Sequence, residues 1–275
     1  MAIENFIPEI WNSQLLLDFQ EQAVAANLVN RQYEGDARRG NTVKITTATR
    51  VTVSDYKADG RTTAPSAVSD EGIDLLIDQE KSFDFYIDDI DRAQSAGSLE
   101  AYTRSASEAL AEDADKFILS ELYDADADPM GGAVSDGEGA WNVIRDLRKD
   151  LNKASVPKGQ RVLFINAEFE ALLLSADAKL TSADVSGSPA GLREATLGNL
   201  LGFRVVTTEN LPGVDEPMAI ALYQPAYAYV SQIQNTEAMR AQDKFADRLR
   251  GLHVYGGKIV RPAGVRVYDA TVSGS

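Results

Sequence analysis

The chain has 275 residues, and 44% of them are hydrophobic, which is enough to fill a core of its own. Its 42 acidic residues outnumber 27 basic ones and give a net charge of -15, which repels phosphate backbones and anionic lipid headgroups. There is no cysteine and only one histidine, His253, so disulfides, thiolate zinc sites and multi-histidine metal centres are excluded. No stretch reaches the roughly 18 apolar residues of a membrane-spanning helix.

The first third of the chain is predicted to hold one helix and two extended segments. Pro8 begins a pattern of apolar residues at helical spacing that continues to about Arg31. Between 43 and 53, apolar β-branched residues alternate with polar ones, which predicts a strand with one buried face. A polar, turn-rich segment, 54–72, separates it from a second strand-like run, 72–87. Because so long a loop is uncommon inside a compact domain, we expect it to contact something outside.

A long helix is predicted over 98–124, roughly 40 Å at 1.5 Å per residue, and the proline and glycine of 124–139 end it. Helices and strands then alternate: helices near 141–153, 167–176 and 196–202, strands at 161–166 and 203–209, and an apolar, strand-prone segment at 217–233. This alternation predicts a mixed α/β lobe. We expect the strand-like tail, 252–270, to return to the sheet that begins near Phe83.

Four carboxylates, Asp84, Asp88, Asp89 and Asp91, crowd the end of the second strand-like run. Such a set suits a magnesium-dependent hydrolase, which we keep as an alternative. Strand alternation, however, puts Asp84 and Asp88 on the outer face and leaves Asp89 and Asp91 in the following turn, with no histidine nearby. A structural or inter-subunit role is therefore favoured, because a metal site needs a preformed set of ligands.

The remaining candidate sites also fail on their chemistry. The acidic run at 124–128 begins like a calcium loop, but Pro129 stands where glycine is required and Ser135 where a bidentate glutamate is required. His253 lies in a strand without a partner for acid–base catalysis. No phosphate-binding or dinucleotide motif is present. We therefore predict no catalytic residue, no cofactor-binding residue and no metal ligand, which favours a structural or binding protein.

Five segments carry a resemblance when they are taken in chain order. They are IPEIW (7–11), NLVNRQYEG (27–35), FDFYIDDIDRAQ (83–94), LGNLLGFRVVTTENLP (197–212) and FADRLRGLHVYGGKIVRPAGVRV (245–267). Together they span nearly the whole chain, and the chain resembles the major capsid proteins of tailed bacteriophages with the Hong Kong 97 fold. An encapsulin-like bacterial compartment shell shares this fold and stays open as an alternative.

The resemblance implies an α+β fold with an N-arm, an extended E-loop hairpin, a peripheral domain built on a long spine helix, and an α/β axial domain. The implied boundaries are 1–34 for the N-terminal arm, 35–82 for the E-loop, 83–129 with 251–275 for the peripheral domain, and 130–250 for the axial domain. The implied function is self-assembly, as pentamers and hexamers, into the icosahedral head that encloses double-stranded DNA. The implied location is the virion, after assembly in the host cytoplasm.

The expected partners follow from this reading. They are further copies of the chain, a scaffold, a portal and decoration proteins, with DNA enclosed without specific binding and no membrane. We expect basic residues of the loop region to meet acidic strips of an adjacent subunit. The basic residues are Lys44, Arg50, Lys57 and Arg61, and the acidic ones are Asp84, Asp88, Glu108 and Glu112. Each exposed pair contributes only about 0 to 1 kcal/mol, so stability must come from repetition around the shell.

Overall fold

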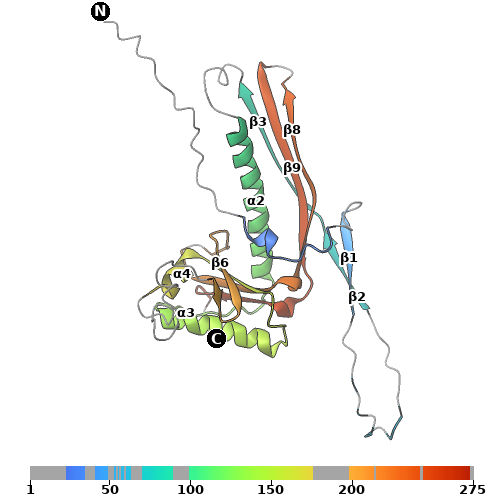
Figure 1. Cartoon of the computed structure of the whole chain (residues 1–275), viewed down its shortest axis with the longest axis vertical. Helices are drawn as coiled ribbons and strands as arrows, with labels where there is room; N and C mark the ends of the chain where they lie inside the picture. The colour runs from blue at the N-terminus through green and yellow to red at the C-terminus, as the bar shows by residue number, and fades with distance from the viewer. Residues whose placement is uncertain are drawn as a thin grey trace, which may run out of the picture.

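The structure is a computed structural model. It describes residues 23–34, 41–48, 53, 55, 57–58, 60–62, 70–88, 99–175, 198–213, 215–241 and 244–272. Within these residues, a long helix and a long sheet form one end of an elongated molecule (Figure 1). A lobe built on a second sheet forms the other end, and a two-stranded ribbon projects beside the base of the long sheet.

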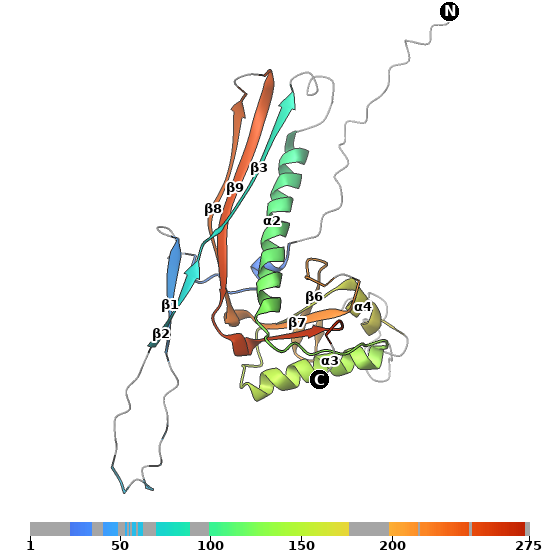
Figure 2. The ribbon, with the colours of Figure 1, turned by 180° about the vertical axis from the view of Figure 1, so that it is seen from behind.

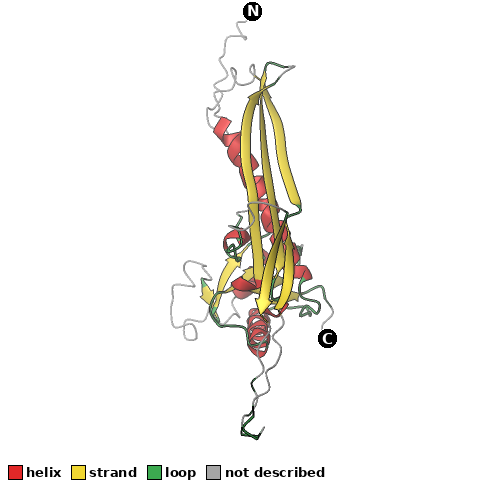
Figure 3. Cartoon of the chain, turned by 90° about the vertical axis from the view of Figure 1, so that its right-hand side faces the viewer, coloured by secondary structure: helices red, strands yellow, loops and turns green. Residues whose placement is uncertain are grey.

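The long helix is α2 (Leu99–Asp124), and it runs along one face of an antiparallel sheet (Figure 2). The strands of this sheet, in spatial order, are β3 (Gln79–Asp88), β9 (Ala246–Ile259) and β8 (Tyr227–Arg240). Seen from the side in Figure 3, the three strands extend along most of α2. Aromatic packing holds helix and sheet together, since the ring of Phe117 on α2 meets that of Tyr255 on β9 edge-on at 5.5 Å.

The lobe contains a five-stranded sheet whose central strand is buried on both faces. Its strands, in spatial order, are β10 (Val265–Asp269), β7 (Met218–Tyr223), β4 (Arg161–Ile165), β6 (Phe203–Thr207) and β5 (Asn199–Leu200). Helices α3 (Gly137–Lys153) and α4 (Ala167–Leu173) pack against one face, where Leu163 and Ile165 point. The other face, with Val162 and Phe164, meets the C-terminal half of α2. This double cover explains why β4 is a continuous apolar run after its first residue.

The ribbon pairs β1 (Thr42–Ala48) with β2 (Asp70–Leu76) in antiparallel register. Its apolar face, with Val43, Ile45 and Leu75, forms a separate small core with Ala228 and Val230 of β8. The base of the ribbon is therefore fixed to the long sheet, while the described residues 57–62 lie well beyond it, on the side away from α2 (Figure 1).

Most of the predicted elements are confirmed. The helix at 98–124, the helix and strand at 141–166, the helix that follows and the strand at 203–209 all form within a few residues of the predicted bounds. The return of the tail to the sheet near Phe83 is confirmed for β9, which pairs with β3 from Gln79 to Asp88. It is wrong for β10, which pairs with β7 in the lobe.

Two local predictions are wrong, and a third is wrong only over the part of it that the structure describes. The predicted N-terminal helix lies mostly outside the described residues, and its described part holds only the 3-10 turn η2 (Ala25–Asn27), because Asn30 joins the edge of β8 instead. The run 72–87 is two strands with different partners, β1 and β9. The predicted helix at 196–202 is a hairpin between β5 and β6, because its Leu201 and Gly202 adopt positive φ angles of 48° and 80° that a helix excludes.

Candidate subunit interface

Across the described ranges, no group of three or more His, Asp or Glu side chains is placed to hold a metal ion. No helix in that part of the chain is long and apolar enough to cross a membrane. The single histidine, His253, is buried on β9, its Nε2 lies 3.1 Å from the hydroxyl of Ser231, and its ring lies 4.8 Å from that of Tyr255.

The outer face of the long sheet, opposite α2, carries a row of charge pairs. The guanidinium of Arg248 donates to both carboxylate oxygens of Asp84, with Nε at 2.8 and 3.0 Å. This hydrogen bonding from Arg248 holds the pKa of Asp84 below its ordinary value. On the neighbouring strand pair, Arg250 donates to Glu237 at 2.6 Å. These contacts cross between strands, so they help to fix the register of the sheet.

The structure places the residues of the predicted acidic strips on two elements, β3 and α2. Asp84 lies on the outer face of β3, and Asp88 is the last residue of that strand, opposite Ala246. Glu108 and Glu112 lie on α2, where each forms an i,i+4 ion pair with a cation of the same helix, at 2.8 and 2.5 Å. The four predicted acidic residues are therefore not one patch, and their contact with a neighbouring subunit stays a prediction. Asp89 and Asp91 lie outside the described residues.

The predicted basic residues follow the ribbon and its loop. Lys44 is exposed on β1, directly opposite Asp74 of β2 in the strand register. Lys57 and Arg61 are exposed in the described pieces of the loop, and no ion pair within the described part of the chain engages either side chain. Arg50 lies outside the described residues.

The sequence analysis did not predict two kinds of feature. One is a set of exposed apolar side chains on the outer face and tip of the long sheet: Met239 (37% exposed), Phe245 (82%) and Leu252 (39%). Their alternation resembles that of buried residues, so the sequence carries no signal of their exposure. The other is Asp115, which lies in the apolar stripe of α2 and is completely buried. An acidic residue next to Ala114 in that stripe was the available signal.

Comparison with known proteins gives one family and one fold. Residues 74–268 match the model of the family described as phage capsid protein. A solved structure from Mycobacterium phage Che8 is 53% identical, covers 99% of this chain and 100% of its own, and superimposes with a TM-score of 0.89. None of the curated proteins matches.

More distant structures share the fold alone. A capsid chain of cyanophage P-SCSP1u is 13% identical, with a TM-score of 0.80, and the match covers 99% of this chain and 95% of that one. A virus-like particle from Pyrococcus furiosus is 16% identical, with a TM-score of 0.54, and the match covers 83% and 86% of the two chains.

Proposed function

Because this chain belongs to the phage capsid protein family, as a major capsid protein with the Hong Kong 97 fold, we propose that it closes its shell through the loop beyond the ribbon. In this proposal the shell is icosahedral, is built of pentamers and hexamers, and encloses double-stranded DNA. The loop of one copy reaches the peripheral surface of the next, so part of each subunit finds its contacts only in the assembly.

The observation that carries this proposal is the position and charge of Lys57 and Arg61. Both side chains are exposed, and neither forms an ion pair within the described part of the chain. The described pieces of the loop that carries them lie beyond the ribbon (Figure 1). The body they would meet is acidic, since the whole chain carries a charge of -15. Charge complementarity therefore favours contact with another copy over contact with a phosphate backbone.

The acidic partners in the proposal are those predicted from the sequence. Asp84 is 39% exposed at its side chain, and Glu108 is 42% exposed, so each keeps carboxylate surface that an incoming cation can approach. Single contacts of this kind are weak and screened by salt. Their repetition around a closed shell supplies the stability, and their individual weakness lets misplaced subunits dissociate.

We also propose how the domains divide. The N-terminal arm is 1–34 and the E-loop is 35–82, with β1 and β2 as its base. The peripheral domain consists of α2 and the sheet formed by β3, β9 and β8. The helix packs against this sheet through β9 and β3. The axial domain is the lobe with the five-stranded sheet, which includes β10. Compared with the implied boundaries, β8 moves to the peripheral domain and β10 to the axial domain.

The other partners are proposals as well. We propose a separate scaffold, portal and decoration protein, and assembly in the host cytoplasm. The net charge of -15 keeps enclosed DNA from adhering to the shell. The encapsulin-like alternative is not favoured, since the 53% identical structure comes from a phage. The magnesium-hydrolase alternative is not favoured either, because Arg248 already occupies both oxygens of Asp84.

Charge reversal tests the proposal. Lys57→Glu and Arg61→Glu are each co-expressed with the candidate scaffold and portal, and shells are counted by negative-stain electron microscopy and sedimentation. Both variants are expected to stay folded and to lose most shells. The matched control is Lys158→Glu, an equally exposed charge reversal in the loop between α3 and β4. Wild-type shell yield from both loop variants contradicts the proposal.

A further inference from the structure

A buried carboxylate joins the start of the described chain to the middle of α2. The side chain of Asp115 accepts hydrogen bonds from three successive backbone N–H groups, those of Val24, Ala25 (2.9 Å) and Ala26 (3.1 Å). Some 90 residues of chain separate donors from acceptor. The 3-10 turn η2 has no capping side chain of its own, so Asp115 supplies from α2 the cap that the local sequence lacks.

Burying the carboxylate of Asp115 costs free energy of desolvation. Asp115 is 0% exposed, and no cation in the described part of the chain pairs with it. Burial raises its pKa, while the three N–H groups act in the opposite direction. An apolar residue at this position would pack against Ala25 and Leu28 without the cost of desolvating a charge. The carboxylate instead specifies the path of the segment, because the backbone at residues 24–26 can present three N–H groups to it on one path only.

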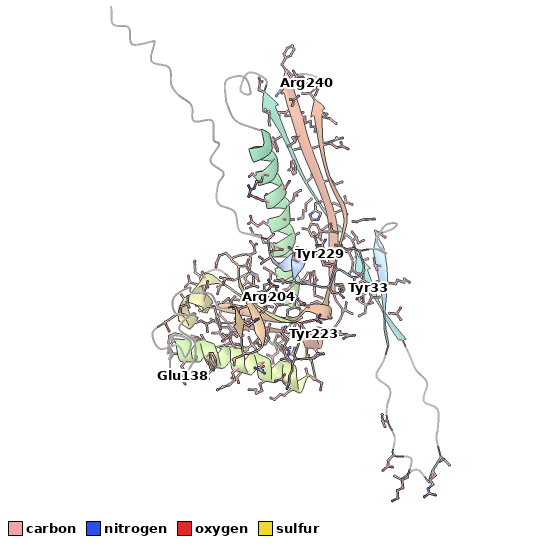
Figure 4. All side chains as sticks on the ribbon, in the orientation of Figure 1. Tyr33, Glu138, Arg204, Tyr223, Tyr229 and Arg240 are labelled. Carbon is pink, nitrogen blue, oxygen red and sulfur yellow. The ribbon has the colours of Figure 1, made fainter. Side chains whose placement is uncertain are left out.

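The next residues fix the segment from its other end. Leu28 and Val29 are buried in the core that α2 shares with β8. Asn30 then forms a parallel bridge with Ala228, donating to the carbonyl of Tyr227 at 3.1 Å and accepting from Tyr229 at 2.9 Å. Figure 4 labels Tyr229 in the region where η2, α2 and the long sheet meet. Residues 24–30 are therefore held at both ends.

We propose that Asp115 is a positioning residue for assembly, which fixes the course of residues 24–30, the described part of the proposed N-terminal arm, on the subunit. In this proposal the arm, like the loop, contacts a neighbouring copy, and the course of residues 24–30 sets the geometry of that contact. The inference rests on the proposed function, in that the arm has to make contacts between subunits. It adds that the geometry of those contacts is set inside the subunit, by one side chain on the spine helix.

The test compares two polar contacts of the same helix. Asp115→Asn keeps the shape of the side chain but turns its amide N–H₂ toward N–H donors, so at least one of the three bonds is lost and the others weaken. The control is Tyr123→Phe, which removes the 2.8 Å hydrogen bond from α2 to Asp269 and leaves residues 24–30 untouched. Hydrogen exchange of the unassembled subunit is measured first, and shell formation second.

In Asp115→Asn, the amides of residues 24–26 are expected to exchange about 10- to 100-fold faster, as for loss of bonds to a charged acceptor. The amides of α3 should not change, and shells should be fewer or irregular in diameter. In Tyr123→Phe, both the exchange at 24–26 and the shells should match wild type. If Asp115→Asn does not fold, Asp115→Ser, which keeps one acceptor oxygen on a shorter side chain, replaces it in the same comparison.

Three results overturn the inference. Unchanged exchange at 24–26 shows that the carboxylate does not hold the segment. Faster exchange with normal shells shows that the held segment does not matter for assembly, and it leaves the loop proposal intact. Shell loss of equal size in Tyr123→Phe shows that stability alone is responsible. Failure of the proposed function is distinct, because it appears as normal shells from the Lys57 and Arg61 variants while Asp115 keeps its effect on exchange.

Discussion

Gly256→Ala is expected to disturb the point where the ribbon joins the long sheet. β2 ends at Leu76, and β3 begins at Gln79, so the chain changes partner strands within two residues. Gly256 of β9 lies directly beneath this crossing. A Cβ atom at Gly256 would lie 2.1 Å from the carbonyl oxygen of Leu76 and 2.8 Å from the Cα of Ile77. Both are backbone atoms, so no side-chain rotation relieves the contact.

The magnitude follows from the distance that must be recovered. Real Cβ contacts are not shorter than 3.0 Å, so the carbonyl of Leu76 must retreat by about 0.9 Å from its 2.1 Å position. Its neighbour Ile77 is buried in the small core and donates to Asn41 at 2.8 Å, which resists that shift. Overpacking of this kind costs about 1 to 3 kcal/mol. Part of the shift should pass to the ribbon and redirect the loop beyond it.

The assay is urea unfolding of the unassembled subunit, followed by electron microscopy of shells. The matched control is Gly72→Ala in β2, where an added Cβ meets nothing within 4 Å. Gly256→Ala is expected to lower the free energy of unfolding by about 1 to 3 kcal/mol, and Gly72→Ala to change it by less than about 0.5 kcal/mol. Equal effects from the two substitutions, or regular wild-type shells from a destabilised Gly256→Ala, refute the reasoning.

Three further predictions concern α2 and the long sheet. Leu122→Ala, at a side chain that is 0% exposed, should lower the free energy of unfolding by about 2 to 5 kcal/mol in urea titrations, whereas Leu252→Ala, at 39% exposure, should change it little. Asp84→Asn should leave thermal unfolding of the subunit near wild type, because its pair with Arg248 is at the surface; a large loss contradicts this. Burial lowers the pKa of His253, so the unfolded state binds its proton more readily, and stability is full above pH about 6.5 and falls below it. Urea titrations at several pH values should show a shallower fall for His253→Gln, and parallel curves for the two proteins would exclude this role.

The sequence was sufficient where local pattern and burial agree. β4 is apolar after Arg161 because both of its faces are covered, and α3 contains the helix predicted near 141–153, although it starts earlier, at Gly137, after the N-cap Asp136. It was insufficient at 72–87, where the alternation is continuous although the strand changes partners at Leu76. Period-two alternation indicates which face of a strand is buried, but it does not indicate which strand is its partner. The change of partner therefore had no signal of its own.

The acidic residues show the same limit, because the sequence pattern does not indicate which surface of the subunit a residue lies on. Asp84, Glu108 and Glu112 were predicted to belong to acidic strips from their type and spacing alone, and the structure places them on β3 and α2, each paired with a cation of its own chain. The sequence therefore predicted the charge of the candidate interface residues but not where they lie on the subunit. Lys57 and Arg61 are exposed, as expected in a polar segment, and their contact with a neighbouring subunit stays a prediction.

The contacts of α2, the spine helix, explain why the sequence did not indicate which of its carboxylates bind distant segments. Along α2, Asp113 accepts from Tyr255 of the long sheet at 2.7 Å, Asp115 accepts from the segment at 24–26, and Tyr123 donates to Asp269 of the five-stranded sheet at 2.8 Å. Each contact faces a different body, and each joins residues separated by 89 or more positions. A helix with one buried face is recognisable from its periodicity, but a helix that packs against three bodies is covered on several sides, and some of its polar residues contact distant segments. In such a helix an acidic residue in the apolar stripe indicates a contact from a distant segment, and Asp115 is the residue for which that rule makes a testable claim about assembly.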